Sequence, residues 1–253
     1  MGKIISFANQ KGGVGKTTSA VNVAASLGIL GSKVLIVDLD PQGNATSGVG
    51  ITKKDLKGTT KEFLTGDIDP KSAIYKTEFE NLWIIPATIT LAGAEFELFD
   101  EEGSEYRLRD LLAPLKDVYD YIIIDCPPSL GTLTINALSA SDGLVVPMQC
   151  EFYSLEGLSQ LMLTVKRIKQ HYNPALSVTG ILVTMYNGRL ILSMQVLSEL
   201  KKHYADKLFS VEISRNVKIS EAPGFGQPVY YHDKRSKGSV EYMEVAKELR
   251  TRI

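Results

Sequence analysis

The chain has 253 residues, of which 44% are hydrophobic and 23% are charged, and its formal net charge is −1. This composition provides enough apolar material for one large core and excludes a disordered or low-complexity chain. The two cysteines are too few for a disulfide framework. No basic leader follows Met1 and no apolar run approaches the roughly 18 residues of a membrane span, so we expect one cytoplasmic domain over residues 1–253.

Short apolar runs alternate with longer amphipathic segments along the chain. Buried parallel strands are apolar on both faces, and the runs with this property span Ile4–Ala8, Val34–Val37, Leu82–Ile85, Tyr121–Ile124, Leu144–Val146 and Val178–Val183. Helical spacing is found over Thr17–Leu30, Leu155–His171, Leu190–Tyr204 and Val240–Leu249. The polar stretch from Thr52 to Asp69 is expected to be an excursion from the sheet.

This alternation predicts an α/β fold with a doubly wound, mostly parallel sheet and helices on both faces. In such sheets ligands bind at the carboxyl ends of the strands, so the residues that follow each strand are the candidates for function.

The first predicted strand is followed by Asn-Gln-Lys-Gly-Gly-Val-Gly-Lys-Thr-Thr over residues 9–18, and a helix begins at once. Glycines allow the backbone N–H groups to turn inward around phosphate oxygens, and the helix N-terminus adds partial positive charge. Lys16 can neutralise the β and γ phosphates of a nucleotide, and the Thr17 hydroxyl is placed to hold Mg²⁺. The segment therefore indicates a P-loop, which makes ATP and Mg²⁺ the expected cofactors.

The loop departs from the usual pattern in one respect, since Gln10 stands where that pattern has glycine and Lys11 precedes Gly12-Gly13. In this it resembles the deviant Walker A ATPases. There the extra lysine reaches the partner's phosphates across a nucleotide-sandwich dimer. The resemblance implies that Lys11 couples ATP binding to formation of a homodimer.

Acidic residues end two further predicted strands. Asp38 and Asp40 stand two residues apart at the end of the second, so one carboxylate can face Mg²⁺ while the other orients or deprotonates the attacking water. We assign the role of orienting or deprotonating the attacking water to Asp40, although an Asp before a proline can instead cap the next turn. Asp125 ends the apolar run Tyr121–Ile124, as a Walker B carboxylate does when it binds a Mg²⁺-bound water.

Further segments resemble the ParA/Soj family of DNA-segregation ATPases over nearly the whole chain. The matching stretches include Asp-Pro-Gln-Gly-Asn-Ala-Thr-Ser-Gly (40–48), Asp-Cys-Pro-Pro-Ser-Leu-Gly (125–131), Glu-Gly-Leu-Ser-Gln-Leu (156–161) and Arg-Asn-Val-Lys-Ile-Ser-Glu-Ala-Pro (215–223). The resemblance implies an ATP-dependent dimer that binds double-stranded DNA without sequence specificity. A ParB/Spo0J-like partner would stimulate hydrolysis and so release the DNA, and this cycle would position chromosome or plasmid origins on the nucleoid.

The same resemblance assigns roles to single positions. It implies phosphate contacts by Lys11, Gly12, Gly13, Val14, Gly15, Lys16, Thr17 and Thr18, with Lys11, Lys16 and Asp40 as catalytic residues and Thr17, Asp38 and Asp125 around the metal. Many family members have proline before the Arg-Asn pair where this chain has Ser214, so the adenine contact is expected at Asn216. DNA contacts are implied for Arg189 and Lys218.

The charge distribution bears on the DNA partner. Residues 1–150 carry 13 basic and 19 acidic side chains, a net charge of −6, whereas residues 151–253 carry 15 and 10, a net charge of +5. The C-terminal part is therefore the place for an anionic partner. Dimerisation would double the phosphate contacts on one face, which would make DNA binding depend on ATP and on salt.

Three other classes share this kind of phosphate loop. A MinD-like membrane ATPase would need a basic amphipathic tail, and the final residues Leu249–Ile253 are better explained by a helix packed on the sheet, so we expect no membrane partner. A nitrogenase-like iron–sulfur reductase would use two cysteines per subunit, but Cys126 lies beside the Walker B carboxylate. A metabolic ligase would need a small-molecule site that the sequence does not identify.

Overall fold

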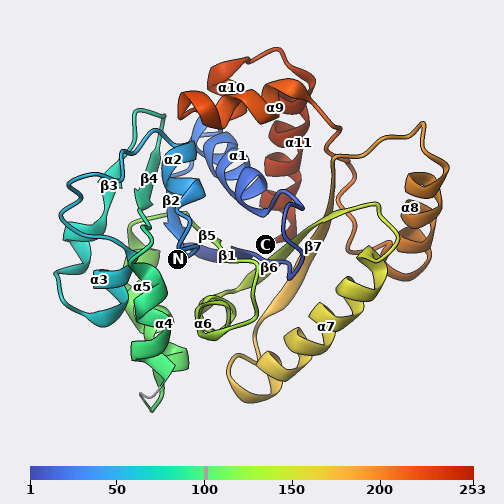
Figure 1. Ribbon diagram of the computed structural model, residues 1–253. Helices are drawn as coiled ribbons and strands as arrows, with labels where there is room; N and C mark the ends of the chain where they lie inside the picture. Colours follow the sequence, from blue (N-terminus) through green and yellow to red (C-terminus); the bar gives the residue numbers. More distant parts are fainter. Residues whose placement is uncertain (100–101) are drawn as a thin grey trace.

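The computed structural model describes residues 1–99 and 102–253 and contains one seven-stranded sheet with helices on both sides (Figure 1). The strand order is β3-β4-β2-β5-β1-β6-β7. All neighbouring strands are parallel except β3 and β4. The strands are β1 (Lys3–Phe7), β2 (Val34–Asp38), β3 (Tyr75–Lys76), β4 (Leu82–Ile85), β5 (Tyr121–Asp125), β6 (Gly143–Gln149) and β7 (Ser177–Thr184).

The helices divide between the two faces of the sheet. One face is covered by α1 (Lys16–Ile29), α2 (Asn44–Gly48), α9 (Val217–Glu221), α10 (Val229–His232) and α11 (Lys237–Arg252). The other carries α3 (Thr60–Thr65), α4 (Leu91–Phe99), α5 (Arg107–Leu112), α6 (Thr132–Ala140), α7 (Ser154–His171) and α8 (Ile191–Tyr204). Short 3₁₀ turns occupy Pro70–Ala73, Ser104–Tyr106, Ala113–Asp117 and Ala222–Phe225.

The central strands send alternate side chains into two separate cores. In β5, Ile122 and Ile124 pack under the helices of one face, and Ile123 packs under those of the other. In β1, Ile4 and Ile5 divide in the same way. Successive residues of a strand point to opposite faces, so a strand covered on both sides must be apolar throughout. This is the pattern on which the predicted sheet rests, and the prediction of a doubly wound fold is confirmed.

The structure adds elements that the apolar pattern did not predict. The edge strand β3 has only two residues, and α3 lies inside the polar stretch that we expected to be an excursion. A capping box begins α3, since the Thr59 side chain accepts from backbone and the Glu62 side chain accepts from the Thr59 backbone. Elements this short present too few residues for a period to be visible. Within the described residues, no helix combines the length and apolarity of a bilayer span.

Candidate nucleotide-binding site

The loop from residue 8 to residue 15 joins the central strand β1 to α1 at the carboxyl edge of the sheet. Gly13 and Gly15 have φ angles of 72° and 82°, in the left-handed region that favours glycine. Gly15 is the N-cap of α1 and provides no side-chain cap, and the first turn of the helix contains no acidic residue. The first N–H groups of α1 are therefore available to an anion, and the helix dipole favours negative charge there.

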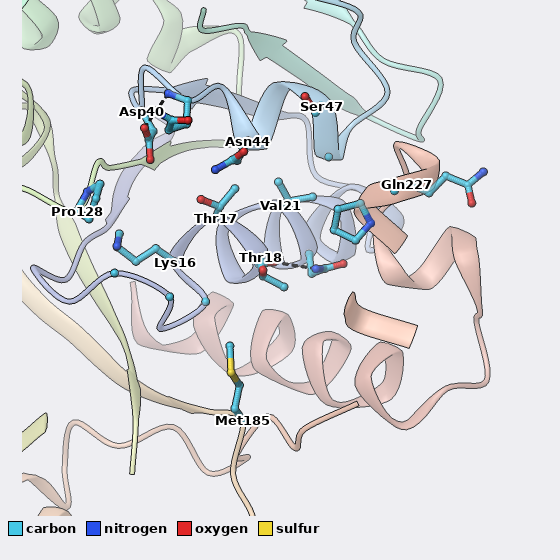
Figure 2. A pocket seen from close by; sticks show the side chains of 18 residues that line it. Lys16, Thr17, Thr18, Val21, Asp40, Asn44, Ser47, Pro128, Met185 and Gln227 are labelled. Atoms are coloured by element: carbon cyan, nitrogen blue, oxygen red, sulfur yellow. Dashed lines mark hydrogen bonds between the residues drawn. The ribbon is translucent and has the colours of Figure 1, made fainter. Parts of the chain in front are cut away.

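A pocket of 730 Å³ lies over this loop and is large enough for a nucleotide. Figure 2 shows Lys16, Thr17 and Pro128 toward one end with Asp40 nearby, and Gln227 at the opposite end. The lining comes from the phosphate loop, from helices α1 and α2, and from loops and turns at the same edge of the sheet: Gly12, Gly13, Gly15, Lys16, Thr17, Thr18, Val21, Asn22, Asp40, Gln42, Asn44, Ser47, Gly48, Pro128, Met185, Pro223, Gly224 and Gln227. Six of the eight predicted phosphate residues and Asp40 thus share one pocket. The other two, Lys11 and Val14, line an adjacent pocket.

Lys16 is buried at 7% exposure, and its Nζ donates to the Lys11 carbonyl oxygen at 3.2 Å. Burial lowers the pKa of Lys16, while the nearby Asp125 carboxyl opposes that shift. An ammonium group held away from water in this way is stabilised further by phosphate oxygens, which accept charge-assisted hydrogen bonds from it.

Asp125 is fully buried at the end of β5, and within the described residues neither of its carboxylate oxygens makes a close hydrogen bond. Burial and the neighbouring Asp38 raise its pKa well above the usual range, although the nearby Thr17 hydroxyl and Lys16 ammonium group oppose this shift. Buried carboxylates without partners are costly, so one that persists beside a phosphate loop fits a cationic ligand. Among the described residues no cluster of three His, Cys, Asp or Glu side chains could hold a metal by itself. Asp125 and Thr17 therefore fit a Mg²⁺ ion that also needs phosphate and water oxygens.

Asp38, which was also predicted to lie around the metal, differs from Asp125 because both of its oxygens accept hydrogen bonds within the chain. Its Oδ2 accepts from the Thr46 backbone N–H at 2.8 Å and from the Thr46 hydroxyl at 2.7 Å, and its Oδ1 accepts from the Asp40 N–H at 3.2 Å. Burial raises the pKa of Asp38 to about 6 against these hydrogen bonds. Since both oxygens are engaged within the chain, Asp38 holds the loop after β2 and the start of α2.

Asp40 lies at the pocket surface on the loop that Asp38 anchors. Its Oδ1 accepts from the Gln42 N–H at 2.9 Å, and its carbonyl oxygen accepts from the Gly43 N–H at 2.8 Å. Asp40 therefore does cap the turn, as one reading of the sequence suggested, and it lines the pocket as well. Its second carboxylate oxygen makes no hydrogen bond with the described residues, so capping and contact with a water molecule are compatible.

Lys11 forms an ion pair with Glu151, which lies between β6 and α7. Both side chains are substantially exposed, at 39% and 54%. Lys11 does not line the 730 Å³ pocket but an adjacent one of 400 Å³, together with Tyr153, Glu156 and residues of the same loop. Its ammonium group therefore points away from the phosphate position of its own subunit.

A second pocket of 340 Å³ continues from the phosphate loop past Gly15 and Thr18 to Asn216 and Tyr242. Asn216 is the N-cap of α9, and its Oδ1 accepts from the Lys218 N–H at 2.8 Å. The side-chain NH₂ of Asn216 is the group left for a ligand. The predicted adenine residue thus lies in a pocket connected to the loop.

The two predicted DNA residues lie on adjoining segments. Tyr186 and Ser214 form a parallel bridge, and Arg189 and Lys218 follow them by a few residues. Arg189 is exposed in the loop before α8, and Lys218 forms an ion pair with Glu221 at 2.9 Å.

Sequence reasoning missed several lining residues, among them Met185, Pro223 and Gln227. Met185 follows β7 directly and has a φ angle of 51°, which is unusual for a side chain of its size. The rule that ligands bind at carboxyl ends of strands could have pointed to Met185. Pro223 and Gln227 come from a segment after no strand, so no local signal marks them.

Comparison with known proteins identifies the family. The family model described as "AAA domain" matches residues 2–178. The sporulation initiation inhibitor protein Soj of Bacillus subtilis is 53% identical over 98% of both chains. The chromosome partitioning protein ParA of Myxococcus xanthus is 49% identical, covering 100% of this chain and 89% of its own length.

Solved structures agree with the fold and with the expected cofactors. A Mycobacterium smegmatis protein named cobyrinic acid a,c-diamide synthase, with bound ADP and magnesium, is 38% identical with a TM-score of 0.86, over 98% of this chain and 93% of its own. The cell division ATPase MinD of Pyrococcus furiosus is 26% identical with a TM-score of 0.83, over 99% of each chain. With two full-length relatives near 50% identity named for partitioning, the chain belongs to the ParA/Soj family of P-loop partitioning ATPases.

Proposed function

We propose that this chain hydrolyses ATP with Mg²⁺ and uses the nucleotide to control a dimer that binds DNA without sequence specificity. The observation that carries the ATPase assignment is the unpartnered Asp125 carboxylate, buried beside a phosphate loop whose lysine is also buried. Burial disfavours the charged form of both groups, and a magnesium–nucleotide complex would bring a cation to Asp125 and phosphate oxygens to Lys16. The partitioning role is supported by the full-length relatives of that name.

The chain's own residues divide the work of hydrolysis. The N–H groups of the loop and Lys16 would bind the β and γ phosphates, and Thr17 and Asp125 would hold the metal with its water. Bound Mg²⁺ would neutralise charge on the phosphate oxygens. Asp40 would orient the attacking water with the carboxylate oxygen that is not used in its turn.

Lys11 would complete the site only in a dimer. In the single chain it is held by Glu151, and exposed ion pairs contribute at most about 1 kcal/mol. Such a pair can exchange readily for a bond to the triphosphate of a second copy, where the charge is larger and water is excluded. ATP would thereby favour the dimer.

DNA binding would follow from dimerisation. Arg189 and Lys218 lie on adjoining segments of the more basic C-terminal part, and pairing of two copies would double their contacts with phosphates. A ParB/Spo0J-like partner would then stimulate hydrolysis and release the DNA, with the protein on the nucleoid while ATP is bound.

Retention on random-sequence DNA tests this proposal when measured with ATP, with ADP and without nucleotide at near-physiological salt. We expect retention with ATP only. Retention in every state would contradict the dimer-gated account. No retention in any state would remove DNA as the partner while leaving the ATPase, and co-sedimentation with anionic vesicles in ATP would then test the MinD-like alternative.

One relative carries a different kind of name, since the 38% identical structure is called a diamide synthase. The two relatives with higher identity are named for partitioning, and we therefore do not propose a ligase. ATP turnover that rose with a small carboxylic acid and ammonia or glutamine, and did not respond to DNA, would reverse this choice.

A further inference from the structure

The carboxylate of Glu241 makes an unusual contact with the wall of the 340 Å³ pocket. Glu241 lies in the second turn of α11 and is only 8% exposed. Its Oε2 accepts from the Ser214 backbone N–H at 2.9 Å and from the Ser214 hydroxyl at 3.0 Å. Its Oε1 lies 3.5 Å from the ammonium of Lys237, which is largely exposed. One buried carboxylate therefore receives both donors of a single residue in the pocket wall.

Ser214 lies at the start of the segment that carries the predicted adenine contact. The residue before it, Ile213, donates to the Val183 carbonyl oxygen at 2.8 Å, so the segment enters from the edge strand β7. Two residues later Asn216 caps α9. Among the side chains facing this segment, Glu241 is the one that accepts its hydrogen bonds at residue 214. Its position should therefore fix where the Asn216 amide points.

The next residue of α11 contacts the opposite wall. Tyr242 is 2% exposed, and its hydroxyl lies 3.2 Å from the Ser19 hydroxyl in α1. The Ser19 N–H donates to the carbonyl oxygen of Gly15 in the phosphate loop at 2.9 Å. Adjacent residues of one helix thus hold the base side and the phosphate side of the pocket. Helix α11 sets the separation between them.

We propose that Glu241 is a positioning residue for the nucleotide base, acting through Ser214 to hold residues 214–216 in the conformation that binds adenine. This inference rests on the proposed ATP binding. The arrangement needs both donors of Ser214, and a residue such as proline, which has neither, could not form it. Among the described residues, the polar contacts of the Glu241 side chain are with Ser214 and Lys237, and none is with the phosphate loop.

The test distinguishes binding of the base from binding of the phosphates by using two probes, ATP and inorganic tripolyphosphate. The affinity for each is measured by calorimetric titration in the presence of Mg²⁺. Glu241→Ala leaves two half-buried donors of Ser214 without an acceptor, so we expect about tenfold weaker ATP binding. Tripolyphosphate affinity should change less than twofold. Glu241→Gln keeps an accepting oxygen and should restore ATP binding to within about threefold of the wild type.

Two further variants guard against a general loss of structure. Glu244→Ala lies on the same helix, where Glu244 is exposed and pairs with Lys247, and it should leave both affinities unchanged. Ser214→Ala removes one donor only, so its effect on ATP should be smaller than that of Glu241→Ala and largely absent in the double variant. If Glu241→Ala does not fold, the affinities of Ser214→Ala and Glu241→Gln for ATP and tripolyphosphate can still be compared with those of the wild type.

Equal loss of ATP and tripolyphosphate in Glu241→Ala would overturn the proposal, because Glu241 would then support the whole site. Unchanged ATP binding in both Glu241→Ala and Ser214→Ala would overturn it too. These outcomes differ from failure of the proposed function, in which the wild-type chain itself would bind neither probe.

Discussion

Asp125 illustrates how a single residue can be costly to the fold and necessary to the site. Its carboxylate is completely buried without a partner, and burial raises its pKa. For an acid whose pKa is raised on folding, the native state holds its proton more tightly than the unfolded chain does. The contribution of Asp125 to the stability of the nucleotide-free protein is therefore fully present when the pH is below the pKa of this group in the unfolded chain. It is lost as the pH rises through the pKa of the group in the folded protein.

Asp125→Asn should therefore stabilise the nucleotide-free protein at pH 8 and bring no gain near pH 4. The amide removes the buried charge at nearly constant shape, and we expect about 1–3 kcal/mol at the higher pH. Urea unfolding at both pH values measures this difference. The same variant should bind ATP without its usual dependence on Mg²⁺. Equal stability of variant and wild type at pH 8 would show that the carboxylate has a partner in solution.

Asp40→Ala should separate binding from turnover. The substitution leaves the phosphate loop intact, so ATP affinity and ATP-dependent dimerisation should stay within about threefold of the wild type. Phosphate release should fall by at least about a hundredfold, as expected when the residue that orients a nucleophile is removed. The Asp40 side chain also caps its turn, so a melting curve must accompany the assay. Loss of ATP binding would contradict the role in orienting water.

The sequence predicted these site residues to different degrees. Lys16 and Thr17 were predicted from the glycine-rich loop between a strand and a helix, and Asp40 and Asp125 were predicted because they come at the ends of strands with a strong apolar pattern. Asp38 satisfied the same rule as Asp125, yet one of its oxygens accepts two hydrogen bonds from Thr46, which lies eight residues away, and the other accepts one from Asp40. A hydrogen bond of that kind leaves no mark in spacing or composition. The contact of Glu241 with Ser214 spans 27 residues and was invisible for the same reason.

At the scale of elements, the loop between β6 and α7 holds Lys11 through Glu151. Glu151→Gln removes the charge and should free the lysine, so that half-maximal dimerisation requires about two- to fivefold less ATP, in line with the small energy of an exposed pair. Light scattering during an ATP titration measures the ATP concentration at which half of the protein is dimeric. Glu199→Gln, which breaks a comparable exposed pair on α8, serves as the control. A requirement for more ATP would mean that Glu151 assists the dimer instead.

The last helix is fastened to the edge of the sheet by Arg252. Its guanidinium donates to the carbonyl oxygens of Thr179 at 3.0 Å, Lys207 at 3.1 Å and Leu208, pairs with Glu248, and lies over the Phe209 ring. These groups bring together three segments that are distant in the sequence. They end α11 on β7.

Arg252→Ala should lower the free energy of unfolding by about 2–4 kcal/mol, because three carbonyl groups and a carboxylate lose a partly buried partner. The melting temperature should fall by about 5–10 °C for a chain of this length. Arg250→Ala is the matched control, since the hydrogen bond from Arg250 to the Leu30 carbonyl oxygen is long at 3.5 Å, and the substitution should cost less than about 0.5 kcal/mol. Equal effects would mean that the network contributes little.

For the whole molecule, the sheet order could be expected only in outline. Apolar strands alternating with helices predicted the parallel, doubly wound arrangement, which is confirmed. The position of β1 between β5 and β6 depends on how helices pack on both faces, and local pattern does not specify it. The two-residue β3 and the short helices α3 and α5 lie below the length at which periodicity is informative.

Salt dependence tests the DNA surface of the whole dimer. If phosphate contacts supply the affinity, log K should fall linearly with log salt concentration. Arg189→Ala and Lys218→Ala would each remove two contacts per dimer, so each should lower the magnitude of the slope by about 2. Lys71→Ala, in the acidic N-terminal part, should leave it unchanged. Affinity that hardly varied between low and physiological salt would exclude this mode of binding.

The central place of β1 also bears on how the protein is made. This strand comprises residues 3–7, yet its two neighbours end at residues 125 and 149. A ribosome that has released only the first hundred residues has exposed the phosphate loop but neither strand that must flank it. The growing chain therefore cannot hold a nucleotide until more than half of it has emerged. The phosphate loop is thus synthesised early, and the strands that flank it are synthesised late.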